Sequence, residues 1–137
     1  MGLVEIEHWP LVVVNWPAGA LGDATIEEAL RTLTSFYGRP HAVLHDGLRA
    51  IDMGASQRRR LMQHSAAYQD EIRASVVASA AVVESPWWRG IIRVMQQLSP
   101  PVEPFRMFAT RVEGEEWLRL ALRRAGLWRP APAPRAA

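Results

Sequence analysis

The fold class follows from one stretch of sequence, Val76-Val77-Ala78-Ser79-Ala80-Ala81-Val82-Val83. It contains no charged residue and is apolar on both of the faces that a strand presents to its surroundings. Such a run is typical of a strand that lies inside a parallel sheet and is covered by helices on both sides. We therefore predict an interior strand at residues 76–83.

A helix is predicted on each side of this strand along the chain. Ser85-Pro86 is an N-cap followed by proline at the first helical position, so one helix runs from there to about Leu98. Before the strand, apolar and small residues recur three and four apart, which predicts one long helix from about Ser56 to Ala74. The inner stripe of that helix would consist of Leu61, Ser65, Tyr68 and Ile72.

The rest of the chain continues the alternation of strands and helices. Local patterns predict strands at Val4–Ile6, Leu11–Val14, Ala42–Leu44 and Phe105–Ala109, and helices at Ile26–Tyr37 and Glu113–Ala125. Repeated strand–helix–strand crossovers favour a parallel sheet with right-handed connections. We predict an α/β fold with a mixed, mostly parallel sheet of about five strands and four helices.

Composition sets the limits of this domain. The chain has 137 residues, 49% hydrophobic and 22% charged, which fits one globular domain. We predict a domain over residues 1–128 and a disordered tail, rich in proline and alanine, over residues 129–137. No uncharged run is long enough for a membrane span and the start lacks a signal-peptide pattern, so the predicted location is the bacterial cytoplasm.

Charge and residue usage exclude several functions. The net charge of +2 is too small to predict a nucleic-acid partner. The chain contains no cysteine, which excludes disulfides, thiolate metal ligands and a cysteine nucleophile. It also contains no lysine, which excludes Schiff-base chemistry and a phosphate-binding P-loop lysine.

Several segments between Val4 and Trp128 resemble the STAS-like, SpoIIAA-like proteins of bacteria. They are the N-terminal hairpin, the arginine-rich helix start Ser56-Gln57-Arg58-Arg59-Arg60, Val82-Val83-Glu84-Ser85-Pro86, Arg89-Gly90, and Phe105-Arg106-Met107-Phe108 followed by Glu115-Glu116-Trp117-Leu118. The resemblance implies the STAS-like version of the fold and a non-enzymatic regulatory or binding module.

One functional motif of that family does not carry over. In the anti-sigma-antagonist branch, a serine that follows an aspartate at a helix start is phosphorylated by a kinase partner. Ala50-Ile51-Asp52 matches the approach to this motif, but Met53 and Gly54 occupy the positions of its serines. Ser56 is displaced from the motif, and we interpret it as a helix N-cap or, alternatively, a phosphosite.

Two clusters are candidate binding sites for a partner or ligand. Arg58, Arg59 and Arg60 would oppose the helix dipole at a helix start, which suits a phosphate, an anionic lipid head or an acidic protein surface; a solvated basic face is the simpler interpretation. Trp87, Trp88 and Arg89 form the second cluster. Adjacent helical residues point about 100° apart, so at least one indole should be exposed, unless a dimer mate or the last helix covers it.

No catalytic or metal site is predicted. His41 and His45 would lie on one strand face about 13 Å apart, with Asp46 on the other face, so these residues cannot chelate one ion together. Asp46 and Asp52 are interpreted as turn caps, since neither a nucleophile nor a glycine-rich phosphate loop accompanies them. We expect no cofactor.

Two hypotheses of function remain. The first is a non-enzymatic STAS-like module that regulates by binding another protein, or itself as a homodimer, through the two clusters above. The alternative is a binder of an apolar or lipid-like ligand in a pocket between the sheet and its helices, with the arginines on an anionic head group.

Overall fold

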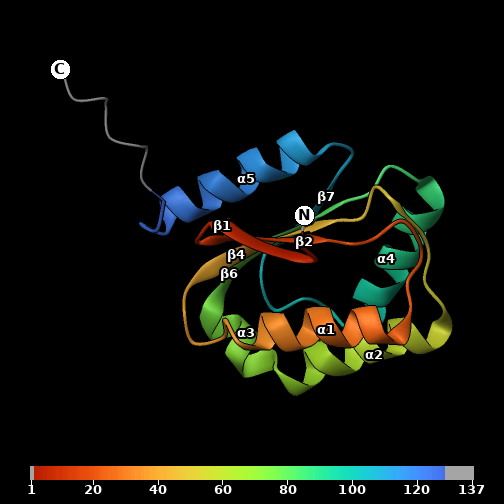
Figure 1. Ribbon diagram of the computed structural model, residues 1–137. Helices are drawn as coiled ribbons and strands as arrows, with labels where there is room; N and C mark the ends of the chain where they lie inside the picture. The colour runs from red at the N-terminus through yellow and green to blue at the C-terminus, as the bar shows by residue number, and fades with distance from the viewer. Residues whose placement is uncertain (1, 129–137) are drawn as a thin grey trace.

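Figure 1 shows the computed structural model of the chain, which describes residues 2–128. The strands are β1 (Val4–His8), β2 (Leu11–Asn15), β3 (Gly19–Ala20), β4 (His41–Asp46), β5 (Ala50–Asp52), β6 (Val76–Val82) and β7 (Phe105–Phe108). The helices are α1 (Asp23–Thr34), α2 (Ala55–Ala67), α3 (Gln69–Ser75), α4 (Pro86–Leu98) and α5 (Arg111–Arg124). The predicted tail, residues 129–137, lies outside the described residues.

The main sheet has five strands in the order β1-β2-β4-β6-β7. The β1–β2 pair is antiparallel, and the pairs β2–β4, β4–β6 and β6–β7 are parallel. The prediction of a mixed, mostly parallel sheet is therefore confirmed, with the stretch from Val76 as the interior strand β6.

Helices cover both faces of this sheet (Figure 1). One face packs against α5 through Leu118 and Leu122, which are both fully buried. The opposite face is covered by α1 to α4, and Ile26 of α1 belongs to its core. Alternate residues of β6 contribute to the two cores: Ala78, Ala80 and Val82 lie in the α5 cluster, whereas Ala81 lies in the other, together with Val83 just after the strand.

The predicted long helix from Ser56 to Ala74 is wrong in one respect, because it breaks at Tyr68. The Tyr68 backbone leaves the helical region at φ −108° and ψ 23°, and this residue separates α2 from α3. Residues 2–128 therefore contain five helices rather than the four predicted. Asp70 and Glu71 consequently lie in the first turn of α3, where negative charge is favourable, and not at the end of a long helix.

Two further details differ from the sequence prediction. The helix α1 runs from Asp23 to Thr34, with Gly22 as its N-cap. It therefore begins three residues before the predicted start at Ile26 and ends three residues before the predicted end at Tyr37. A small parallel sheet pairs β3 with β5 beside the main sheet. These strands have only two and three residues, too short for a periodic pattern.

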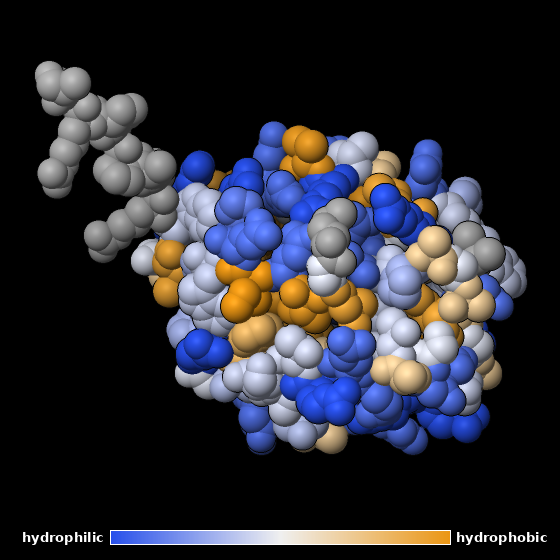
Figure 2. Space-filling view, in the orientation of Figure 1, coloured by the Kyte–Doolittle hydropathy of each residue, from blue (hydrophilic) through white to orange (hydrophobic). Residues whose placement is uncertain are grey.

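The hairpin β1–β2 forms one edge of the main sheet. Hydrophobic residues gather on this face of the molecule between the hairpin and α1 (Figure 2). Ile6 of β1 contributes to the exposed apolar surface of the edge, with 50% of its area accessible. The alternating glutamates Glu5 and Glu7 place charge on the same strand, a common protection of an edge strand against pairing with other chains.

The approach of α5 to the sheet requires a glycine. A Cβ atom at Gly114 would lie 2.9 Å from Cδ1 of Leu44 and 3.4 Å from Cγ2 of Val82. Leu44 and Val82 are both completely buried, so neither can move aside without disturbing the core. Gly114 therefore sets the distance between α5 and the sheet.

Replacing Gly114 by leucine should lower the free energy of unfolding by about 1–3 kcal/mol, because overpacking forces the helix away from the sheet. Urea denaturation would measure the change. Gly90→Leu is the matched control, since no atom lies within 4 Å of a Cβ at that position of α4. Equal stabilities of the two variants would show that α5 is not held by this close approach.

Candidate functional site

A cavity of about 490 Å³ lies between the helices α2 and α4 and the face of the sheet opposite α5. Its size falls within the range of small-molecule sites in proteins. Most of its lining is apolar, and the main apolar contributors are Trp16, Leu33, Val43, Met53, Leu61, Met62, Ile72, Ala81, Val83, Trp88, Ile92, Met95 and Phe105. The pocket lies between the sheet and its helices, the place where the alternative hypothesis put a ligand.

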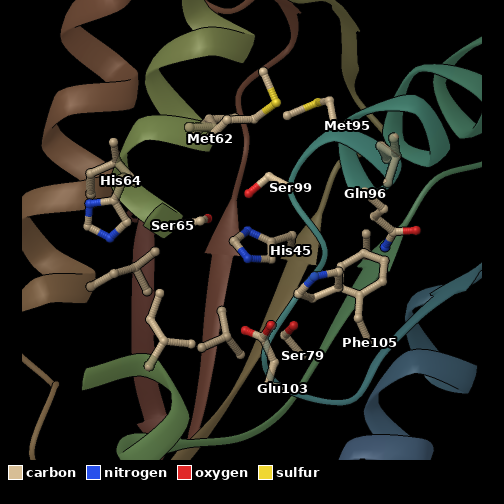
Figure 3. A pocket seen from close by; sticks show the side chains of 18 of the residues that line it. His45, Met62, His64, Ser65, Ser79, Met95, Gln96, Ser99, Glu103 and Phe105 are labelled. Carbon is tan, nitrogen blue, oxygen red and sulfur yellow. The ribbon is translucent and has the colours of Figure 1, made fainter. Parts of the chain in front are cut away.

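Small side chains of β6 leave space at the bottom of the cavity. Val76, Ser79 and Ala81 are the β6 residues that line the cavity, and Ser79 and Ala81 are too small to reach the helices above them. Met62 of α2 and Met95 of α4 extend toward each other across the opposite side of the pocket (Figure 3). Flexible methionines at such a place adapt to ligands of different shape.

His45 of β4 points into the middle of the cavity (Figure 3). Trp16 Nε1 donates a hydrogen bond of 3.3 Å to Nδ1 of His45, and the two rings stack with centroids 6.1 Å apart. Burial lowers the pKa of His45 from its ordinary 6.5 to about 4, so the ring is neutral at pH 7. Because Nδ1 accepts from Trp16, the proton of the neutral ring is on Nε2, which makes Nε2 a donor.

Glu103 and Ser79 form a second polar group, on the same side of the cavity as Phe105 (Figure 3). The Ser79 amide donates a 2.9 Å hydrogen bond to the Pro104 carbonyl, which fixes the loop before β7 against β6. Burial raises the pKa of the Glu103 carboxyl group, and hydrogen bonds from its own backbone and from the Ser79 hydroxyl partly offset that rise.

A third polar pair lies at the α2 wall. The Tyr37 hydroxyl and Nε2 of His64 are 2.9 Å apart, and the His64 ring also packs on Tyr68 with centroids 4.7 Å apart. Burial lowers the pKa of His64 and raises the pKa of Tyr37. Both groups are therefore neutral at pH 7, and they satisfy each other rather than face the cavity with a charge.

The predicted arginine cluster does not form part of this cavity. Arg58 Nη1 donates to the Met53 carbonyl at 2.6 Å, and Arg60 pairs with Glu27 of α1. Within residues 2–128, Arg59 makes no hydrogen bond or ion pair and is exposed. Two of the three arginines thus have partners within the fold, whereas Arg59 has none among residues 2–128.

The tryptophan cluster is divided in the way that helix geometry requires. Trp87 is 71% exposed, whereas Trp88 is 8% exposed and lines the cavity. Arg89 Nε donates to the Val83 carbonyl at 2.8 Å and ties the helix start to the end of β6. The expectation that one indole is exposed is met, but Trp88 belongs to the interior.

Ser56 is not a helix N-cap. The helix α2 begins at Ala55 with Gly54 as its N-cap, so Ser56 is the second residue of the helix and is exposed there. The earlier start removes the capping role that the sequence suggested. Asp52 instead accepts a 2.8 Å hydrogen bond from the Met53 amide.

The acidic and histidine residues considered for a metal have other partners. Asp46 forms an ion pair with Arg111 of α5 at 3.5 Å and accepts from the Leu48 amide at 3.2 Å. His41 Nδ1 is bonded to the Arg39 carbonyl at 2.7 Å. Within residues 2–128, no group of three or more histidine and carboxylate side chains is placed to hold a metal ion. None of the described helices combines the length and the apolar character that crossing a bilayer requires.

Comparison with solved structures identifies the fold. An uncharacterised protein of the DUF3478 family with a SpoIIAA-like fold, from Shewanella loihica PV-4, matches at a TM-score of 0.58 and 14% identity, over 84% of this chain and 90% of that one. An anti-sigma factor antagonist from Mycobacterium paratuberculosis matches at a TM-score of 0.54 and 16% identity, over 85% of this chain and 92% of that one. Comparisons of the sequence with models of protein families and with curated proteins find no match.

The chain therefore has a SpoIIAA-like fold, as its sequence predicted. Sequence reasoning missed Ser79 and Glu103 as site residues. Ser79 was a detectable signal, because it is a lone polar residue among the small side chains of the interior strand. Glu103 lies in a loop between prolines, where no periodic pattern indicates its direction.

The buried His45 should make stability depend on pH. Its folded pKa of about 4 lies below the ordinary 6.5, so the unfolded state binds more protons between these values. Stability is complete above about pH 6.5 and decreases as the pH falls toward about 4, by up to about 3 kcal/mol. Urea unfolding of the wild type and of His45→Gln at about pH 7 and about pH 5 would measure it. The variant should lose less stability on acidification, and an equal loss would contradict the assignment.

Proposed function

We propose that this protein is a non-enzymatic STAS-like module of the bacterial cytoplasm that binds an apolar small molecule between its sheet and the helices α2 and α4. The observation that carries the proposal is the cavity of about 490 Å³ with its largely apolar lining. An anionic head group held by arginines does not suit this site, because the described lining contains no arginine.

Three features support binding rather than catalysis. The cavity walls are aromatic and aliphatic side chains, which bind by burial and not by proton transfer. His45 uses one ring nitrogen for Trp16, and its low pKa makes it a poor base at pH 7. Ser79 is bonded to the loop of Glu103 and has no histidine hydrogen-bonded to it among the described residues, so it lacks the activation that a nucleophile needs.

Filling the cavity should abolish binding without unfolding the protein. In Ala81→Phe, the new ring would occupy the space above β6, and the affinity for the neutral apolar dye N-phenyl-1-naphthylamine should fall by about tenfold or more. Dye fluorescence during titration measures the affinity, and native mass spectrometry of the purified protein would reveal a retained ligand.

Ala24→Phe is the matched control, since Ala24 is exposed on α1 and lies outside the lining. Thermal unfolding of each variant shows whether the fold is retained, and Ser79→Val provides a second cavity variant. Undiminished dye binding in both folded cavity variants would contradict the proposed site.

A second function, protein binding, is favoured by the outer face of α4. Trp87, Val94 and Leu98 follow the helical repeat and are 71%, 54% and 71% exposed. The helix carries Arg89 and Arg93 and no acidic residue. Packing against a second copy would bring arginines together, so the surface suits a different protein with an apolar patch edged by carboxylates. One neighbour in fold is an anti-sigma factor antagonist, a regulator whose name implies protein partners.

The double variant Trp87→Ala/Val94→Ala, at two exposed positions outside the cavity lining, should weaken such a partner's binding by about tenfold or more, since exposed aromatic residues contribute strongly at interfaces. Affinity capture would identify the partner, and calorimetry with the purified pair would measure the affinity. Val112→Ala/Leu120→Ala removes comparable exposed apolar surface from α5 and should bind normally. Arg59→Glu tests whether the start of α2 belongs to the same surface. Equal affinities of all variants would exclude the outer face of α4.

A further inference from the structure

Polar side chains occur at several places in the lining, and one group of them comes from the sheet and the loop beside it. His45, Ser79 and Glu103 come from β4, β6 and the loop before β7, and Figure 3 shows Ser79 and Glu103 next to each other below His45. Their closeness follows from the sheet, because β4 and β6 are neighbours in parallel register, with Val43 opposite Ser79 and His45 opposite Ala81. We call His45, Ser79 and Glu103 the polar wall.

The polar wall has an excess of negative charge. Glu103 is the only lining residue among those described whose side chain is an acid, and no lysine or arginine lines the cavity. The two lining histidines, His45 and His64, are neutral at pH 7 because burial lowers their pKa values. A carboxyl group in an apolar cavity without a cation is left to be satisfied by Ser79, by water or by a ligand.

The wall also offers a donor. His45 Nδ1 accepts the hydrogen bond from Trp16, so the ring proton is on Nε2. No described residue accepts a hydrogen bond from this Nε2–H group. The ring retains accessible surface although it lies deep in the fold, because that surface faces the cavity. A ligand hydroxyl or amine can donate to the Glu103 carboxyl group, and a ligand oxygen can accept from His45 Nε2.

We infer that the ligand of this cavity is an apolar molecule whose polar end donates hydrogen bonds, either an alcohol or an amine, and that fatty acids and other anionic amphiphiles are excluded. The inference rests on the proposed function, since it names the chemical class of ligand for the same cavity. The apolar body of the ligand lies against the side chains of α2 and α4, and its polar end meets Glu103.

Electrostatic interactions with Glu103 favour neutral and cationic ligands over anionic ones. A ligand carboxylate beside Glu103 would place two negative charges together in surroundings of low dielectric, where repulsion is much stronger than in water. An ammonium group would pair with the carboxylate, and a hydroxyl would form a hydrogen bond to it. An anionic ligand would find neutral hydrogen-bond donors such as His45 Nε2, but no lysine or arginine among the described lining residues to neutralise its charge.

The test uses three probes with the same alkyl chain, namely 1-dodecanol, dodecylamine and dodecanoate. Each is added to the purified protein below its micelle-forming concentration, and displacement of bound N-phenyl-1-naphthylamine is followed by fluorescence. The alcohol, the amine or both should displace the dye at concentrations about tenfold lower than dodecanoate. Preference for the amine alone would indicate an ion pair with Glu103, and equal binding of alcohol and amine would indicate hydrogen bonding.

The variant Glu103→Gln removes the negative charge and retains the shape of the side chain. Dodecanoate should then approach the affinity of the other probes, whereas Glu116→Gln, an exposed carboxylate on α5, should leave the preference unchanged. Thermal unfolding shows whether each variant is folded, and the preference of the wild type tests the inference without any variant.

The outcomes separate the inference from the proposed function. Dodecanoate binding as tightly as the alcohol and the amine in the wild type would overturn the inference and leave the apolar cavity as a binding site. A failure of the dye and of all three probes to bind would overturn both.

Discussion

The structure depends on the small side chains of the interior strand β6. Ala78 and Ala80 on one face allow α5 to approach closely, and Gly114 of that helix completes the contact against Leu44 and Val82. On the other face Ser79 and Ala81 are equally small, but no helix moves in to fill the space. One strand composition therefore produces a tightly packed layer on one side of the sheet and a cavity on the other.

Polar contacts of arginine side chains connect the helices over the cavity with neighbouring parts of the fold. Arg58 holds the start of α2 to the Met53 carbonyl and Arg60 joins α2 to Glu27 of α1, while Arg89 fixes the start of α4 to the end of β6. These contacts anchor the two helices near their N-termini. Arg58, Arg60 and Arg89, which the sequence marked as candidate binding residues, thus all have partners within the fold.

Much of the fold could be predicted from the sequence, because the long uncharged run of β6 and the Ser85-Pro86 helix start are local signals. The break at Tyr68 could not, because the helical spacing of Leu61 and Ile72 continues through it and only tertiary packing of the Tyr68 ring on Tyr37 and His64 accompanies the change. For the site, the exposure of one indole could be predicted, because Trp87 and Trp88 are neighbours in a helix and point in different directions. The meeting of Ser79 and Glu103 depends on strand order, which the sequence does not encode locally.

The aromatic lining has a practical consequence. Of the six tryptophans in the chain, Trp16 and Trp88 line the cavity, and Trp16 is hydrogen-bonded to the histidine at its centre. The emission of an indole depends on the polarity around it and on its hydrogen bonds. Replacement of water by a bound molecule therefore alters the intrinsic tryptophan fluorescence of the protein. This fluorescence reports whether the cavity is occupied.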